Sequence, residues 1–100
     1  MSGEDLRGKD FNGKELQMRN FSGAYLQGAS FIGADLQRAN FSGADLTGAL
    51  LCDAILGHAN FSGANLTGAN LEGARFLMTA NLTGAKLTGA TMPDGDIYRG

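Results

Sequence analysis

A large apolar residue recurs at every fifth position of this chain. The spacing runs without a miss from Leu6 to Phe76 and, after one inserted residue, resumes from Leu82 to Met92. A period of five fits neither a strand, with its period of 2, nor an α-helix, with its period of about 3.6, so the backbone must turn within every repeat to keep these side chains inside. The chain is therefore predicted to be a solenoid, and we call the recurring apolar residue the centre of each repeat.

Alanine stands two positions before the centre in fourteen of the eighteen repeats. A small side chain beside a large one fits a narrow interior, where a second bulky residue would clash. The residue between them is often Asp or Asn, which should point outward. The clearest triplets are Ala34-Asp35-Leu36, Ala44-Asp45-Leu46, Ala64-Asn65-Leu66 and Ala69-Asn70-Leu71.

On these triplets the sequence resembles the pentapeptide-repeat family, from about Leu6 to Met92. The resemblance implies an all-β fold, a right-handed quadrilateral parallel β-helix with one pentapeptide on each side and twenty residues per coil. Eighteen repeats then make about 4.5 coils. We expect this solenoid to cover residues 1–92, with an irregular N-terminal edge at 1–5, and a separate tail to cover residues 93–100.

A twenty-residue super-period supports four sides per coil. The block Asn-Phe-Ser-Gly-Ala occupies residues 20–24, 40–44 and 60–64, and a close copy occupies residues 81–85. Glycine fills the second position after the centre in twelve repeats, as expected for a turn that requires a positive φ. Four exceptions lie twenty residues apart and predict one side with a turn that tolerates side chains: Met18, Arg38, His58 and Met78. Thr79 is predicted to be the extra residue, in a bulge at a corner.

The two ends of the solenoid expose strand edges, which invite pairing with other chains. At the N-terminal end four charged residues replace the alanine and predict a stop to further stacking, with basic ligand contacts as the alternative: Glu4, Lys9, Lys14 and Arg19. At the other end the tail leaves the repeat at Pro93. Ile97 and Tyr98 are expected either to fold over the last coil or, with Met92, to form a C-terminal homodimer contact of the kind the family resemblance implies.

The remaining composition offers little chemistry. A net charge of −2 gives no footprint for nucleic-acid binding. Cys52 and His58 are the single residues of their types, so an internal disulfide and a Cys/His zinc site are excluded. No catalytic constellation is present, and we predict no enzyme activity, no cofactor and no metal. Without an apolar N-terminal or membrane-spanning stretch, a cytoplasmic location is expected.

Apolar residues at outward positions are the more informative anomalies. Six of them are predicted to gather along one edge of the rod as a protein contact: Ile32, Leu50, Cys52, Ile55, Leu77 and Met78. The alternative is that each is a lone substitution. The leading hypothesis is therefore a non-enzymatic interaction or scaffold module whose protein partner is unknown. The family resemblance offers a second, a DNA mimic that binds type II topoisomerases, although weak negative charge and short length argue against it. A third is an idealised or engineered repeat without a partner.

Overall fold

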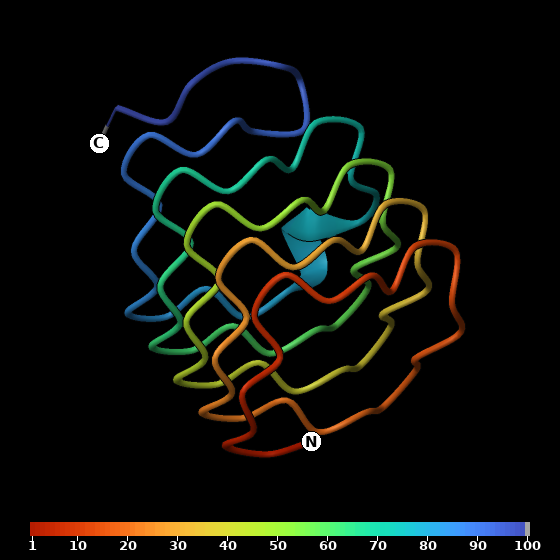
Figure 1. Cartoon of the computed structure of the whole chain (residues 1–100). Helices are drawn as coiled ribbons and strands as arrows, with labels where there is room; N and C mark the ends of the chain where they lie inside the picture. The colour runs from red at the N-terminus through yellow and green to blue at the C-terminus, as the bar shows by residue number, and fades with distance from the viewer. Residues whose placement is uncertain (100) are drawn as a thin grey trace.

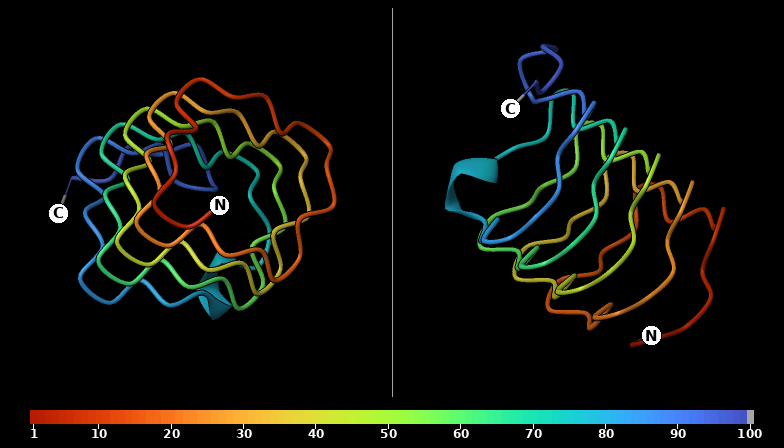
Figure 2. Two further views of the ribbon diagram at one scale, coloured as in Figure 1. Left: turned by 60° about the horizontal axis from the view of Figure 1, so that its bottom comes forward. Right: turned by 90° about the vertical axis from the view of Figure 1, so that its left-hand side faces the viewer.

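The computed structural model describes residues 1–99, which wind into a four-sided right-handed coil with the termini at opposite ends (Figures 1 and 2). The residue before each centre forms a parallel bridge with its counterpart one coil later, as between Asn20 and Asn40. Each side contributes one bridged residue per coil, so these are isolated bridges rather than longer strands. Within residues 1–99 the one helix is the 3-10 turn η1 (Leu77–Thr79). The predicted quadrilateral β-helix is confirmed.

The bridged residues form four columns, and we number the sides by them. The first side carries Asp5, Tyr25, Asp45, Asn65 and Lys86; the second carries Asp10, Ser30, Leu50, Asn70 and Thr91; the third carries Glu15, Asp35, Ile55 and Arg75; the fourth carries Asn20, Asn40, Asn60 and Asn81.

The core is the column of centres and alanines inside the coil. From Phe21 to Leu71 every centre is fully buried, as are the alanines of the central coils. The rings of Phe21, Phe41 and Phe61 stack one above another on the fourth side with centroids 5.0 Å apart. Stacked rings and buried apolar area stabilise the fold together, because each coil covers the centres of its neighbour.

The corner turns are alike on all sides of the regular coils, which corrects one prediction. Gly43 has a φ of 66°, and Met18, Arg38 and His58 adopt nearly the same left-handed value, with φ between 57° and 63°. The side that lacks glycine therefore does not use a different turn. The square path of the coil dictates the conformation, and residues with a Cβ adopt it at a steric cost.

The insertion lies at Phe76, not at Thr79 as predicted. Phe76 takes a left-handed conformation (φ 64°) and is 49 % exposed, whereas Leu77 is buried at the position of the centre. The Thr79 hydroxyl donates a hydrogen bond to the Phe76 carbonyl (2.8 Å) and accepts one from the His58 N–H (3.0 Å). The bulge thus pushes the aromatic ring outward, and η1 protrudes from the outline of the coil (Figure 2).

The tail turns back and pairs with the edge of the second side. Ile97 forms an antiparallel bridge with Thr91, and the Tyr98 N–H donates to the Ala90 carbonyl at 2.8 Å. The Met92 N–H donates to the Asp96 carbonyl at 2.7 Å. The tail therefore covers one side of the last coil as an added strand, with the Ile97 and Tyr98 side chains partly exposed.

Candidate interaction surfaces

Three of the predicted contact residues gather on the second side. Ile32 and Leu50 are each 37 % exposed, and Cys52 is half-buried. Ile32 and Cys52 occupy the same position in successive coils, since the Gly33 N–H donates to the Cys52 carbonyl at 2.9 Å. We call Ile32, Leu50 and Cys52 the second-side patch. It is a small apolar area on an otherwise polar side.

The Cys52 thiol belongs to this patch as an apolar group. Burial raises the pKa of Cys52, and the neighbouring carboxylates of Asp53 and Glu72 act in the same direction. Its Sγ lies 4.0 Å from the Asn70 carbonyl oxygen. A thiol with a raised pKa carries little thiolate at neutral pH, so packing explains this residue better than reactivity.

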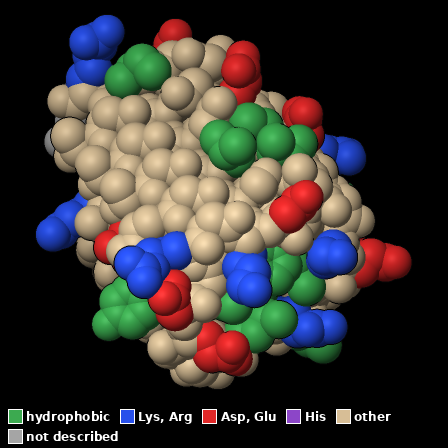
Figure 3. Space-filling model, in the orientation of Figure 1, with side chains coloured by type: hydrophobic (Ala, Val, Ile, Leu, Met, Phe, Trp, Pro, Cys, Tyr) green, Lys and Arg blue, Asp and Glu red, His purple; other side chains and the backbone are tan. Residues whose placement is uncertain are grey.

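The other three predicted contact residues do not join the patch. Ile55 is half-buried on the third side, and Met78 is 91 % exposed at the last coil. The outward placement of Leu77 is wrong because the insertion turns it into the core. Figure 3 agrees that exposed hydrophobic side chains form small separate groups on the face shown, not a continuous band.

Sequence reasoning missed Phe76, which it placed inside. A signal was available in the columns, since the third-side centres Leu16, Leu36 and Leu56 are all leucine. Placing Leu77 next in this column keeps it uniform, whereas Phe76 would have introduced a ring above three leucines. The outward Phe76 ring instead lies under the Arg75 guanidinium, whose carbon is 5.4 Å from the ring centroid.

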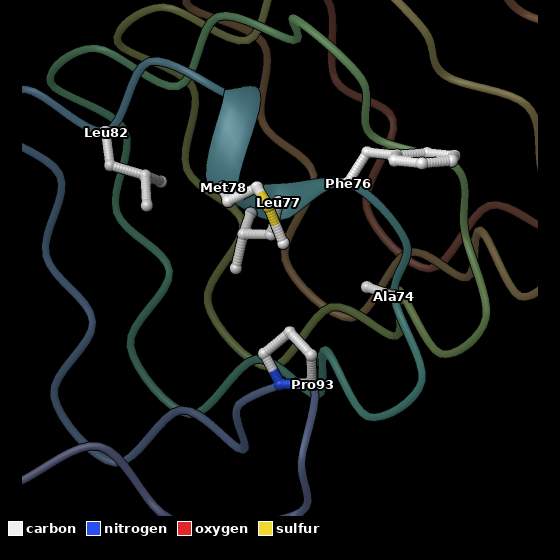
Figure 4. A pocket seen from close by; sticks show the side chains of 6 residues that line it. All are labelled: Ala74, Phe76, Leu77, Met78, Leu82 and Pro93. Carbon is white, nitrogen blue, oxygen red and sulfur yellow. The ribbon is translucent and has the colours of Figure 1, made fainter.

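A cavity of about 320 Å³ opens at the C-terminal end of the coil (Figure 4). The side chains of Leu77, Leu82 and Pro93 point toward its common space. The cavity arises because the tail leaves after Met92 and does not continue over the third side. Its lining is apolar and consists of Ala74, Phe76, Leu77, Met78, Leu82 and Pro93.

The N-terminal end is charged over a closed floor. Leu6, Phe11 and Leu16 are buried there, with exposures of only 4–7 %. The four charged residues that replace alanine are all exposed: Glu4, Lys9, Lys14 and Arg19. This exposure fits the predicted edge stop, which stays a prediction.

The ion pair of Asp5 and Arg7 lies beside this end, and the two residues line a hollow together with Tyr25 and Gln27. The Arg7 guanidinium donates two hydrogen bonds to the Asp5 carboxylate, at 2.8 and 2.7 Å. These bonds lower the pKa of Asp5 to about 2. The two groups satisfy each other, so neither is left to serve as an acid or a base.

Within residues 1–99, no group of three or more His, Cys, Asp or Glu side chains is arranged to hold a metal ion. Over the same residues, no helix has the length and apolar character needed to cross a membrane.

The repeated architecture agrees with the comparison to known families. The family described as pentapeptide repeats matches in 8 copies, over residues 20–51 and 44–76. This match covers more than half of the chain, so the protein belongs to the pentapeptide-repeat family. Members of this family are generally non-enzymatic structural or interaction modules. A search of curated proteins finds no significant match.

Several solved structures are similar. One is HetL, a pentapeptide repeat protein involved in heterocyst differentiation regulation in the cyanobacterium Nostoc sp. strain PCC 7120. It is 33 % identical to this chain, with a TM-score of 0.66, and the alignment covers 94 % of this chain and 49 % of HetL. A pentapeptide repeat protein from the Arabidopsis thaliana thylakoid lumen is 44 % identical, with coverages of 97 % and 70 % and a TM-score of 0.64. The chain thus spans about half the length of HetL. Because the second relative is lumenal, a cytoplasmic location stays a prediction.

The fluoroquinolone resistance protein QnrB1 is also similar, at 23 % identity, with 90 % of this chain and 68 % of that chain covered and a TM-score of 0.63. At this identity the likeness supports a shared fold and says nothing of a shared target.

Proposed function

We propose that this chain is a non-enzymatic interaction module and that its second-side patch contacts a partner protein. The observation that carries the proposal is Leu50. It stands in a column whose other members are all polar, namely Asp10, Ser30, Asn70 and Thr91. An exposed leucine in a polar column has no role in the core, whereas clustered exposed apolar groups typically mark interaction surfaces.

The scaffold supports this use of the patch. In the regular coils the backbone is tied to both neighbouring coils, as where the Leu50 N–H donates to the Ala29 carbonyl and the Leu50 carbonyl accepts from Phe31. A backbone held in this way presents its outward side chains at fixed positions, and fixed positions reduce the entropy lost on binding. The patch can therefore serve as a small preorganised contact.

The test compares two glutamate variants, one within the patch and one on the opposite side of the coil. Leu50→Glu places a carboxylate within the patch, and Asn60→Glu places one at the corresponding outward position on the fourth side, opposite the patch. A partner is first captured from the native host by the unmodified protein and identified, and its affinity for each variant is then measured. We expect Leu50→Glu to weaken binding about tenfold or more and Asn60→Glu to have little effect. Equal affinities for the parent and Leu50→Glu would remove the patch from the proposal.

The structure does not favour DNA mimicry. The fourth side presents a column of uncharged asparagines, and the first side mixes Asp45 with Asn65 and Lys86. A DNA mimic needs regularly placed negative charge to stand for phosphates. Supercoiling by DNA gyrase should therefore be unchanged by an excess of this protein, and inhibition would favour the mimic instead.

A further inference from the structure

The C-terminal rim of the coil leaves strand groups unpaired. In the regular coils each centre N–H donates to the next coil, as Phe41 does to the Asn60 carbonyl at 2.7 Å. Each residue two before the centre accepts from the next coil, as the Ala59 carbonyl does from Asn81 at 2.9 Å. Within residues 1–99 the last coil has no such partners on its third and fourth sides. The unpaired groups are the N–H groups of Leu77, Leu82 and Gly84 and the carbonyls of Ala74 and Ala80.

The protein itself shows that this rim accepts an added strand. The tail already pairs with the second side through Thr91 and Ile97, and its last described hydrogen bond there is made by Tyr98. The third and fourth sides continue the same rim without a covering segment from the described chain. The tail runs antiparallel to the second side, whereas a segment that followed the course of the coil over the third and fourth sides would pair in parallel, as successive coils do.

The cavity supplies an apolar anchor beside these unpaired groups. Leu77 and Leu82 both line it, and both carry one of the free N–H groups. At about 320 Å³ it exceeds the roughly 150 Å³ that suffices for a benzene ring in an apolar protein cavity. In the regular coils this place is filled by the centre of the next coil. A large apolar side chain from an added strand would occupy it in the same way.

An acidic corner adjoins the cavity. The corner between the second and third sides is occupied in successive coils by Asp53, Gly73 and Asp94. The Gly73 N–H donates to the Pro93 carbonyl of the next coil at 3.0 Å. Glu72 lies at the same corner, since its carbonyl accepts from Asp53 at 3.0 Å. An added parallel strand would begin here, so a basic residue before the apolar anchor would meet complementary charge.

We propose that the C-terminal rim binds an extended peptide segment of a partner protein, which adds as a parallel strand along the third and fourth sides. One large apolar side chain fills the cavity, and a basic residue before it faces the corner of Asp53, Glu72 and Asp94. The segment donates its backbone N–H groups to the Ala74 and Ala80 carbonyls. This proposal rests on the chain being an interaction module, but it uses a surface separate from the second-side patch.

The test uses a labelled synthetic peptide and the full chain. The peptide carries two lysines followed by a copy of residues 54–63, which occupies the same two sides one coil earlier. In the proposed register the N–H of its Asn60 equivalent donates to Ala80, whereas the N–H of its Phe61 equivalent points away from the rim. We expect N-methylation at the first site to weaken binding about tenfold or more, and at the second by no more than about twofold, as measured by fluorescence anisotropy.

Two protein variants locate the site. Met78→Glu alters a side chain that is 91 % exposed at the cavity and should weaken peptide binding about tenfold. Met18→Glu is the matched control, because Met18 lies on the same side at the opposite end and is 71 % exposed. It should bind the peptide like the parent, as should Leu50→Glu, so that failure of the second-side patch and failure of this site are distinguishable.

Three results would overturn the proposal. The first is the absence of saturable peptide binding by the folded parent. The second is an equal loss for the two N-methylated peptides, because it would contradict the strand register. The third is a homodimer, detected by light scattering, that buries the rim and excludes the peptide, since a second copy would then be its occupant.

Discussion

The two ends of the coil expose the same kind of backbone edge but are finished in different ways. At the N-terminal end, charged residues such as Lys9 and Lys14 surround a floor of buried centres. At the C-terminal end the tail covers the second side only, and Leu82 stays partly buried beside an apolar opening. Charge discourages a further strand, whereas an open apolar edge invites one. The comparison indicates that the coil has a blocked end and a receptive end.

The first comparison of stability takes one centre at each end. Phe11→Ala should lower the free energy of unfolding by about 3 kcal/mol, because the ring is 7 % exposed and stacks on Phe31 at 4.9 Å. Leu82→Ala should cost only about 1 kcal/mol, since Leu82 is partly exposed beside a cavity. Chemical denaturation of both variants measures the difference. Equal losses of unfolding free energy would mean that the centres at the two ends are equally well covered.

Phe41→Ala gives the loss of unfolding free energy for a centre in the middle of the stack, with which the two end variants are compared. Its ring is fully buried between Phe21 and Phe61, and we expect a loss of about 3–5 kcal/mol. A loss smaller than that of Phe11→Ala would contradict the view that the ends are the weaker parts of the stack.

The next effect concerns the tail at the receptive end. Tyr98→Pro removes the N–H that donates to the Ala90 carbonyl and should lower stability by about 1–2 kcal/mol. Arg99→Pro is the control, because within residues 1–99 the Arg99 N–H makes no hydrogen bond. Thermal unfolding and amide exchange at Met92 and Gly95 measure the change. If both variants resembled the parent, the tail would contribute nothing to covering the second side.

Much of this architecture could be predicted because the same pattern recurs many times in the sequence. The period of five required a turn in each repeat, and the recurrence at twenty gave the columns that the bridges confirm. The prediction of a different turn on the third side was wrong because it relied on residue type and not on the path of the coil. Met18 and His58 lack the freedom of glycine, yet the square path of the coil imposes the same left-handed turn on them.

The insertion at Phe76 and the C-terminal rim were harder to predict from the sequence, for a different reason. Phe76 and Leu77 are adjacent and both apolar, so the five-residue rule alone cannot say which one enters the core. The unpaired groups near Leu82 depend on the path of the tail, which pairs through backbone atoms that every residue has. Patterns of side chains do not encode such pairing directly, and the receptive end was therefore missed.

A smaller effect tests the blocked end. Replacing Lys9, Lys14 and Arg19 together with alanine restores the repeat at those positions, and each change should alter stability by no more than about 0.5 kcal/mol. The exposed N-terminal edge should then self-associate, as measured by sedimentation velocity. The control variant removes the same number of positive charges elsewhere, at Arg75, Lys86 and Arg99. Association of both variants would attribute the effect to net charge, and association of neither would mean that the charges do not block the edge.

The smallest effect is confined to Asp5 and Arg7. Two hydrogen bonds from Arg7 lower the pKa of Asp5 from 3.8 to about 2, so the pair favours the folded state above pH 3.8 and loses this contribution as the pH falls through about 2. Both side chains are exposed, and solvent screening keeps the contribution to stability small. Arg7→Gln should return the pKa of Asp5 toward 3.8 in a carboxyl NMR titration, while Arg19→Gln should leave it near 2. An unchanged Asp5 titration in Arg7→Gln would show that the pair does not form in solution, and the charges of the blocked end would then act only by deterring a further strand.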